Sequence, residues 1–185
     1  MRGFILGIIF TLIALAAGGW WWLKQGYLDF AADHQASRFE GKLAMDAVDA
    51  STDRRAPEAR NPVQPTPANL AAGAKLYLDH CAGCHGVPSH PDSQFARSFN
   101  PPVPEFFNDP PDMSESQNFY IIQHGIRWTG MPAWNRTLSD TEIWEVVTFL
   151  ANLGKLPPEA QKVFGPEPAN APEPMQMPAG MKMNH

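Results

Sequence analysis

The chain has 185 residues and a formal net charge of −5, from 19 acidic and 14 basic side chains. This length allows one ordinary domain with appendages, and the acidic balance argues against a nucleic-acid partner. An acidic surface suits a partner with a basic docking face, although such a balance also arises from solubility alone.

The first predicted element is an apolar helix over residues 4–23, which carry no charge. A helix of about 20 apolar residues crosses roughly 30 Å of hydrocarbon. Residues 20–22 are all tryptophan and resemble an interfacial belt, and Lys24 follows them. We therefore expect residues 1–23 to be a transmembrane anchor. The alternative is a cleaved signal peptide, because residues 14–16 (Ala-Leu-Ala) resemble a cleavage site.

Residues 24–66 are predicted to be a linker outside the membrane. Their charges are mixed, and residues 56–66 are rich in proline, which indicates polyproline II character. Ser37, with an acidic residue three positions later, predicts a short helix near residues 38–50. Three apolar residues share one side of that helix, namely Phe39, Leu43 and Ala47. This side packs on the next domain or on a partner.

A helix is predicted next over residues 69–82. Its apolar residues at helical spacing are Leu70, Ala74, Tyr77 and Leu78. Gly73 lies among them and allows a neighbouring element to approach closely.

Cys81-Ala82-Gly83-Cys84-His85 is the most informative segment of the chain, and it holds both cysteines. Two thiols on one helical turn can each form a thioether with a heme vinyl group, and the adjacent imidazole can bind the iron. One alternative is a zinc site completed by His80, His90 and His124, but no second cysteine pair exists. The other is a dithiol redox site, which normally follows a βαβ context. We expect one covalent heme c held by Cys81, Cys84 and His85.

Two further elements follow the heme-attachment segment. Residues 101–104 contain three prolines, which favours a rigid loop over regular structure. A capping box at Ser114 and Gln117 predicts a helix that stops at Gly125.

Residues 124–134 (HGIRWTGMPAW) contain a candidate for the second axial ligand, Met131. Gly130 allows close backbone approach, and Pro132 stiffens the loop that presents the thioether. Met113 and His124 are the rival ligands. Because of the cysteine segment and this Gly-Met-Pro turn, the chain resembles a class I c-type cytochrome over about residues 69–157.

The resemblance implies an all-α fold of three to five short helices around one covalently bound heme. It implies Met131 as the distal iron ligand, opposite His85. It also implies that a proline carbonyl accepts the other N–H of His85, and Pro102 is the candidate. Further candidates for the heme pocket are Arg127 as a propionate partner and Trp128 and Trp134 as walls.

The last predicted helix covers residues 139–153 and begins with a capping box at Ser139 and Glu142. Its apolar face is predicted to hold Ile143, Trp144, Val147 and Leu150. Gly154 and Pro157 end it, so the cytochrome domain is expected over residues 67–157.

Residues 158–185 are predicted to be a flexible tail, because Pro, Ala, Glu and Met dominate them. Soft thioethers and a terminal imidazole suit Cu(I) there, at Met175, Met177, Met181, Met183 and His185. The alternative is that these methionines are flexible apolar groups that dock on a partner or a membrane.

The resemblance further implies that heme is attached outside the cytoplasm. We therefore expect a single-pass protein of a bacterial inner membrane, with its heme domain in the periplasm. The expected function is one-electron transfer between redox proteins, such as those of a membrane respiratory complex, without enzymatic activity, small-molecule substrate or nucleic acid. The alternatives are a heme sensor or enzyme with a labile sixth ligand, and a copper-handling protein that uses the methionine-rich tail.

Overall fold

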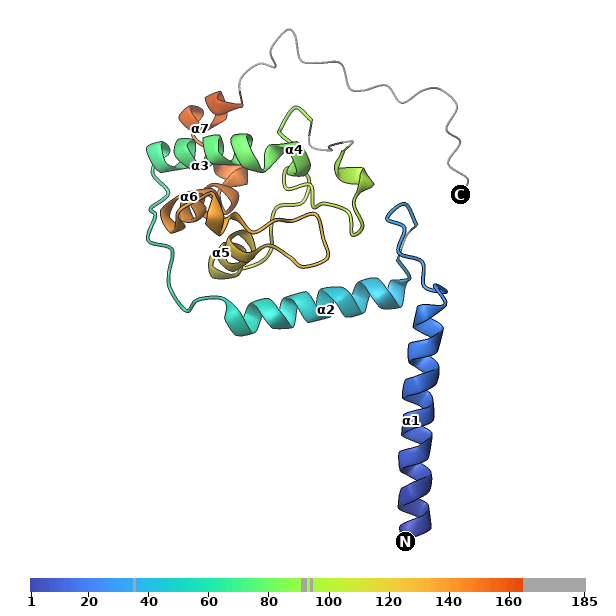
Figure 1. Cartoon of the computed structure of the whole chain (residues 1–185). Helices are drawn as coiled ribbons and strands as arrows, with labels where there is room; N and C mark the ends of the chain where they lie inside the picture. Colours follow the sequence, from blue (N-terminus) through green and yellow to red (C-terminus); the bar gives the residue numbers. More distant parts are fainter. Residues whose placement is uncertain (35, 91–92, 94, 165–185) are drawn as a thin grey trace, which may run out of the picture. The chain divides into compact units, whose positions relative to one another are not determined.

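The computed structural model describes residues 1–34, 36–90, 93 and 95–164. Over these residues the chain consists of α-helices, short 3-10 turns and loops, and none of them forms a strand (Figure 1). The chain divides into two units, Met1–Gln35 and Ala36–His185. The prediction of an all-α fold is confirmed.

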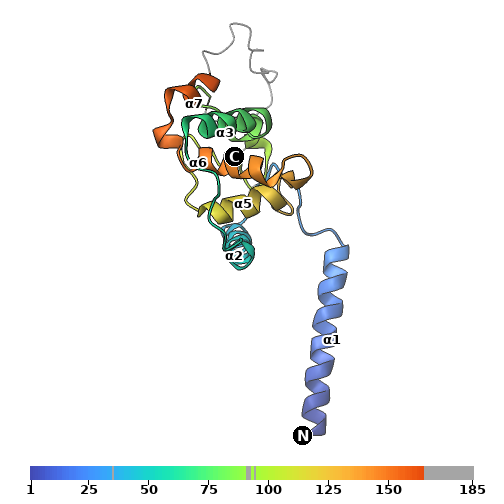
Figure 2. The ribbon, with the colours of Figure 1, turned by 90° about the vertical axis from the view of Figure 1, so that its left-hand side faces the viewer.

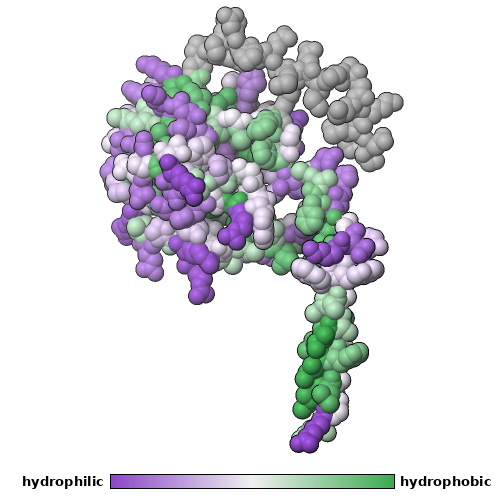
Figure 3. Space-filling view, viewed as in Figure 1, coloured by the Kyte–Doolittle hydropathy of each residue, from purple (hydrophilic) through white to green (hydrophobic). Residues whose placement is uncertain are grey.

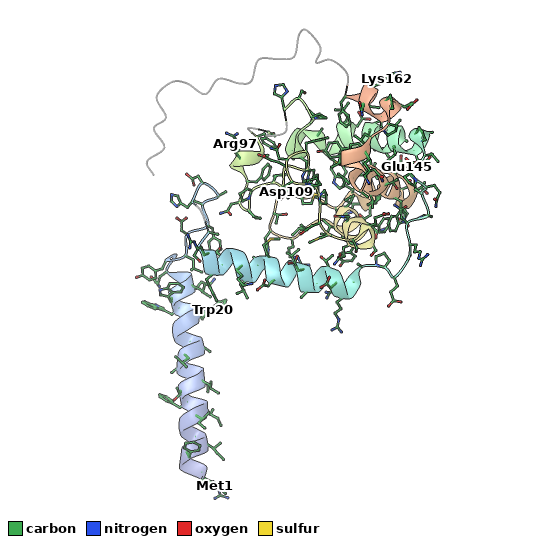
Figure 4. The ribbon with its side chains drawn as sticks, turned by 180° about the vertical axis from the view of Figure 1, so that it is seen from behind. Met1, Trp20, Arg97, Asp109, Glu145 and Lys162 are labelled. Carbon is green, nitrogen blue, oxygen red and sulfur yellow. The ribbon has the colours of Figure 1, made fainter. Side chains whose placement is uncertain are left out.

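The first unit holds α1 (Arg2–Lys24), none of whose residues is buried. Its apolar side chains cover the helix along its length (Figure 3). Trp20 lies near the C-terminal end (Figure 4), and the Lys24 ammonium lies 5.0 Å from the centroid of its ring. By length and composition α1 is able to cross a membrane, and an N-terminal signal sequence has the same properties.

The core of the second unit forms where α3 (Pro67–His80) crosses α6 (Asp140–Leu150), and the two helices lie side by side in Figures 1 and 2. Gly73 allows α3 and α6 to approach each other closely where they cross. A Cβ at Gly73 would lie 2.2 Å from the carbonyl oxygen of Glu145, on α6. The largest fully buried side chains belong to these two helices, namely Tyr77, Phe149, Ile143, Val146 and Val147. Leu78 is 40% exposed, so its predicted place on the buried side of α3 is wrong.

The third helix of this core is α5 (Glu115–His124), and it packs on α6. The Phe119 ring stacks on the Trp144 ring with centroids 4.1 Å apart. Both predicted capping boxes are present, at Ser114 before α5 and at Ser139 before α6. Gly125 ends α5 with a φ of 66°, a conformation that favours glycine.

A short helix, α7 (Pro158–Val163), extends the packed domain beyond the predicted boundary at residue 157. Ala160 is fully buried, and Phe164 packs against Tyr77, Phe107 and Phe149 at centroid distances of 5.7–6.4 Å. The predicted tail therefore contains a segment that completes the aromatic core. The copper candidates, residues 175–185, lie outside the described residues.

The predicted linker also belongs in large part to the second unit. Its helix α2 (Arg38–Arg55) begins at the expected Ser37 cap but continues five residues beyond the predicted end. Thr52 on α2 is buried, and Gln117 of α5 donates a hydrogen bond to Asp53. Further on, the Asn61 amide donates to Glu115 at 2.6 Å and to Thr148 at 2.8 Å. Residues 52–63 are thus fastened to the helical core.

Candidate functional site

The candidate heme-attachment segment is a helical turn directly after α3. Cys81 ends α3 and begins α4 (Ala82–His85). The N–H groups of Cys84 and His85 both donate to the Cys81 carbonyl, at 3.0 and 2.9 Å. Because residues three and four positions apart share a helix face, this turn places the imidazole and both sulfurs in one neighbourhood. Burial, with a smaller contribution from Cys84, raises the pKa of Cys81 to about 12.

A backbone carbonyl fixes the imidazole of His85. Its Nδ1 donates to the carbonyl oxygen of Pro104 at 2.9 Å, which leaves Nε2 as the ring nitrogen available to a metal. Pro102 is the predicted partner, and this is corrected to Pro104, because the loop backbone turns the later carbonyl toward the ring. Burial lowers the pKa of His85, and the Pro104 hydrogen bond opposes that shift. The neutral imidazole that binds metals is therefore favoured.

Phe106 is a residue of the site that sequence reasoning missed. Its ring stacks on the His85 ring with centroids 4.3 Å apart and an interplanar angle of 6°. Together the Pro104 carbonyl and the Phe106 ring hold the imidazole in one orientation. The signal available in the sequence was the aromatic pair Phe106-Phe107, directly after the proline-rich loop.

Met131 lies in a loop that is closed by its own hydrogen bonds. The N–H of Ile126 donates to the Met131 carbonyl at 3.2 Å, and the N–H of Met131 donates to the Thr129 hydroxyl at 3.1 Å. A Cβ at Gly125 would lie 2.6 Å from the Met131 carbonyl oxygen, so the start of the loop requires glycine. The Met131 side chain is half-buried and packs against the same apolar core as Cys81.

Gly130, directly before Met131, is tightly packed. A Cβ there would lie 2.3 Å from the ring of Phe99, which in turn meets the ring of Phe95 edge-on. The loop before Met131 therefore rests on an aromatic ring from the segment that follows the cysteines. This contact joins the Met131 loop to the segment that follows the candidate heme-attachment turn.

The three remaining heme-pocket candidates lie in different environments. Trp134 is half-buried against the core, with its ring 5.2 Å from the His80 ring. Trp128 is 91% exposed, with a φ of 63° that is unusual for a bulky residue, and Arg127 is exposed beside it. Of these three residues, only Trp134 packs against the core.

The rival ligands, Met113 and His124, lie near opposite ends of α5. His124 is exposed at the end of α5, with its ring 4.6 Å from that of Tyr120. The backbone carbonyl of Met113 accepts a hydrogen bond from Asn118, just before α5. In the part of the chain that the structure describes, no three His, Cys, Asp or Glu side chains group to hold a metal, so nothing there completes a zinc site around the cysteines.

The donor set fits a heme c. It offers two thiols on one turn, an imidazole whose Nδ1 is already engaged, and a thioether on a loop that glycines hold in place. Cys81 and Met131 pack against one apolar core, which suits a macrocycle and keeps the local dielectric low. Imidazole and thioether are the axial pair typical of electron-transfer hemes.

A match to a protein-family model supports this assignment. Residues 68–150 match the family model described as cytochrome c oxidase, cbb3-type, subunit III. A chain of the reducing HAO-like protein complex of Kuenenia stuttgartiensis is 25% identical over 52% of this chain and 50% of its own length, with a TM-score of 0.42. This chain thus matches about half the length of that structure's chain. No curated protein matches. The segment matched by the family model contains Cys81, Cys84, His85 and Met131.

Proposed function

Because this chain contains a c-type cytochrome domain, which implies covalently bound heme c and electron transfer, we propose that the protein is a membrane-tethered mono-heme carrier of single electrons. The observation that supports this most directly is that contacts within the chain hold both candidate iron ligands in place. The Pro104 carbonyl orients His85. A hydrogen-bonded loop presents Met131, and this loop contains the tightly packed glycines Gly125 and Gly130.

Each residue of the site has a distinct role in the proposal. Cys81 and Cys84 would form the thioether links to heme c, and His85 and Met131 would supply the ligands to its iron. Heme c, when bound, supplies a one-electron iron couple. With both of these residues bound to the iron, no coordination site would be left for a substrate or a gas, which is why we propose a carrier and not an enzyme. Phe106 and Trp134 exclude water from the site, which helps to hold the potential up.

The apolar N-terminal helix supports the proposed location. With α1 as an uncleaved anchor in a bacterial inner membrane, the heme domain works in the periplasm. The partners are then redox proteins in or beside that membrane, such as the subunits of a respiratory complex. Tethering keeps the carrier near them and raises its effective concentration.

The proposal is tested on protein purified from membranes. Pyridine hemochrome and intact-mass measurements should find one heme per chain, retained after denaturation, and a Cys81→Ser/Cys84→Ser variant should lose that covalent link. The reduced wild type should not bind carbon monoxide. Carbon monoxide binding by the wild type would support a sensor or an enzyme with a labile sixth ligand instead. A colourless protein would refute the heme assignment.

A further inference from the structure

The helix α2 has an exposed apolar face, and the inference drawn from it rests on the proposed membrane anchoring. We propose that Phe39 and Leu43, on one side of α2, bind the lipid surface of the membrane that holds α1. In α2 these two side chains are 78% and 58% exposed. They are four positions apart and form one apolar stripe.

The stripe faces away from the domain to which α2 is attached. Leu43 and the buried Thr52 are nine positions apart, and so are Phe39 and the half-buried Val48. Nine positions correspond to about two and a half helical turns, which puts the members of each pair on opposite sides of the helix. One side of α2 is therefore used for packing on the domain, and the opposite side presents the stripe to the surroundings.

Exposed apolar side chains concentrate around this part of the chain. Among the described residues after α1, most of the exposed large apolar side chains precede residue 46, namely Tyr27, Leu28, Phe30, Phe39, Leu43 and Met45. The rest of the chain adds Leu78, Phe95 and Trp128. A segment that follows an anchor and is rich in exposed aromatic and aliphatic groups has the composition of the membrane interface.

The short segment between α1 and α2 favours lipid over a protein as the binding partner of the stripe. Only residues 25–37 separate the end of α1 from the start of α2. A segment of that length spans at most about 45 Å, so α2 always begins close to the bilayer that holds α1. A lipid surface is thus permanently available to the stripe at high effective concentration, whereas a protein partner must arrive by diffusion.

The charges of α2 permit this contact. Arg38, Lys42, Arg54 and Arg55 balance four acidic residues on the helix, and Lys42 is paired with Asp46 at 2.9 Å. No net charge of the helix therefore opposes binding to an anionic leaflet. Because Gln117 and Asn61 fasten this part of the chain to the core, binding of the stripe fixes the height of the heme domain above the membrane.

The test uses the full-length holoprotein in nanodiscs of phosphatidylcholine and phosphatidylglycerol with a fluorophore on a lipid headgroup. Quenching of this fluorophore by energy transfer to the heme reports the distance of the heme from the surface. We expect Leu43→Asp to lower the transfer efficiency about twofold, because the released domain then moves on a flexible tether by roughly 20 Å. Ala44→Asp, which adds the same charge one position away from the stripe at another exposed site, should match the wild type.

Each outcome decides the proposal. Equal transfer in the wild type and in both variants overturns it. If Leu43→Asp leaves transfer unchanged but slows heme oxidation in native membranes, the stripe binds a protein and the lipid assignment is wrong. Flotation of the nanodiscs tests anchoring separately, since a protein without a membrane anchor would not float with them. Thermal unfolding of both variants should equal that of the wild type, because both side chains are exposed.

Discussion

Met131 is the residue on which the proposed chemistry depends most. Met131→Ala would remove the proposed thioether ligand, while the loop retains the hydrogen bonds made by Ile126 and Thr129. We expect the reduced variant to bind carbon monoxide, which the wild type should not bind, and to have a lower midpoint potential, since a thioether ligand raises it. His124→Ala is the matched control for the rival ligand and should behave as the wild type in both measurements.

Among the residues of the site, the candidate ligands could be predicted from the sequence, but the residues that hold them in place could not. Both thiols and His85 are recognisable because their spacing along the chain is what heme attachment requires, and Met131 because its Gly-Met-Pro turn resembles that of class I c-type cytochromes. The acceptor for the imidazole is not, because three prolines compete within residues 101–104 and only the path of the backbone selects Pro104. Phe106 and Phe99 escaped notice for the same reason, since their roles depend on which ring the folded loop brings against the site.

At the scale of elements, the crossing of α3 and α6 depends on Gly73. In Gly73→Ala the added Cβ would meet the Glu145 carbonyl oxygen at 2.2 Å and the Phe149 Cβ at 2.9 Å, so the helices must separate. We expect a loss of about 1–3 kcal/mol in the free energy of unfolding, measured by denaturant titration. Gly41→Ala on α2 has no atom within 4 Å of its new Cβ and should be neutral or slightly stabilising. Equal effects of the two substitutions would contradict the packing account.

The capping box of α6 should make stability depend on pH. The backbone N–H and the hydroxyl of Ser139 donate to the Glu142 carboxylate and lower its pKa below its ordinary value of 4.5. A carboxylate with a lowered pKa stabilises the folded state above its unfolded pKa, and this contribution is lost as pH falls through the folded pKa. The thermal midpoint of the wild type should exceed that of Glu142→Ala at neutral pH, and the difference should shrink in acid. A difference independent of pH would argue against an ionised cap.

Elements defined by local signals were predictable, and elements defined by distant contacts were not. The two capping boxes and the stop at Gly125 are local, and all three are present. α7 begins directly after Pro157, the predicted helix stop, and the Phe164 contacts with the core hold the segment in place. The extension of α2 to Arg55 likewise accompanies the burial of Thr52 and the hydrogen bond from Gln117.

At the scale of the whole molecule, Asn61 fastens the segment after α2 to two helices at once. In Asn61→Ala the Glu115 and Thr148 side chains lose a donor, and the turn at Val63 loses the Asn61 acceptor. We expect a loss of about 1–2 kcal/mol in the free energy of unfolding and faster hydrogen exchange around residues 56–66. Asn135→Ala, on an exposed side chain, is the control. Unchanged exchange in Asn61→Ala would show that these hydrogen bonds do not hold the segment.

The molecule therefore joins an apolar N-terminal helix to a cytochrome domain through a segment that is mostly fastened to that domain. The composition of residues 24–66 predicted a linker with only a short helix near residues 38–50, because charged and proline-rich stretches usually lack a core of their own. The hydrogen bonds of Asp53 and Asn61 show that such a stretch can use the core of a neighbouring domain.

The near-infrared spectrum of the purified ferric protein tests the central proposal most directly. Covalent heme held between His85 and Met131 predicts the weak sulfur-to-iron charge-transfer band of a low-spin, six-coordinate heme in the wild type. A ferric wild-type spectrum that lacks this band, with high-spin heme or with no heme at all, would contradict the assignment of a His/Met-ligated electron carrier.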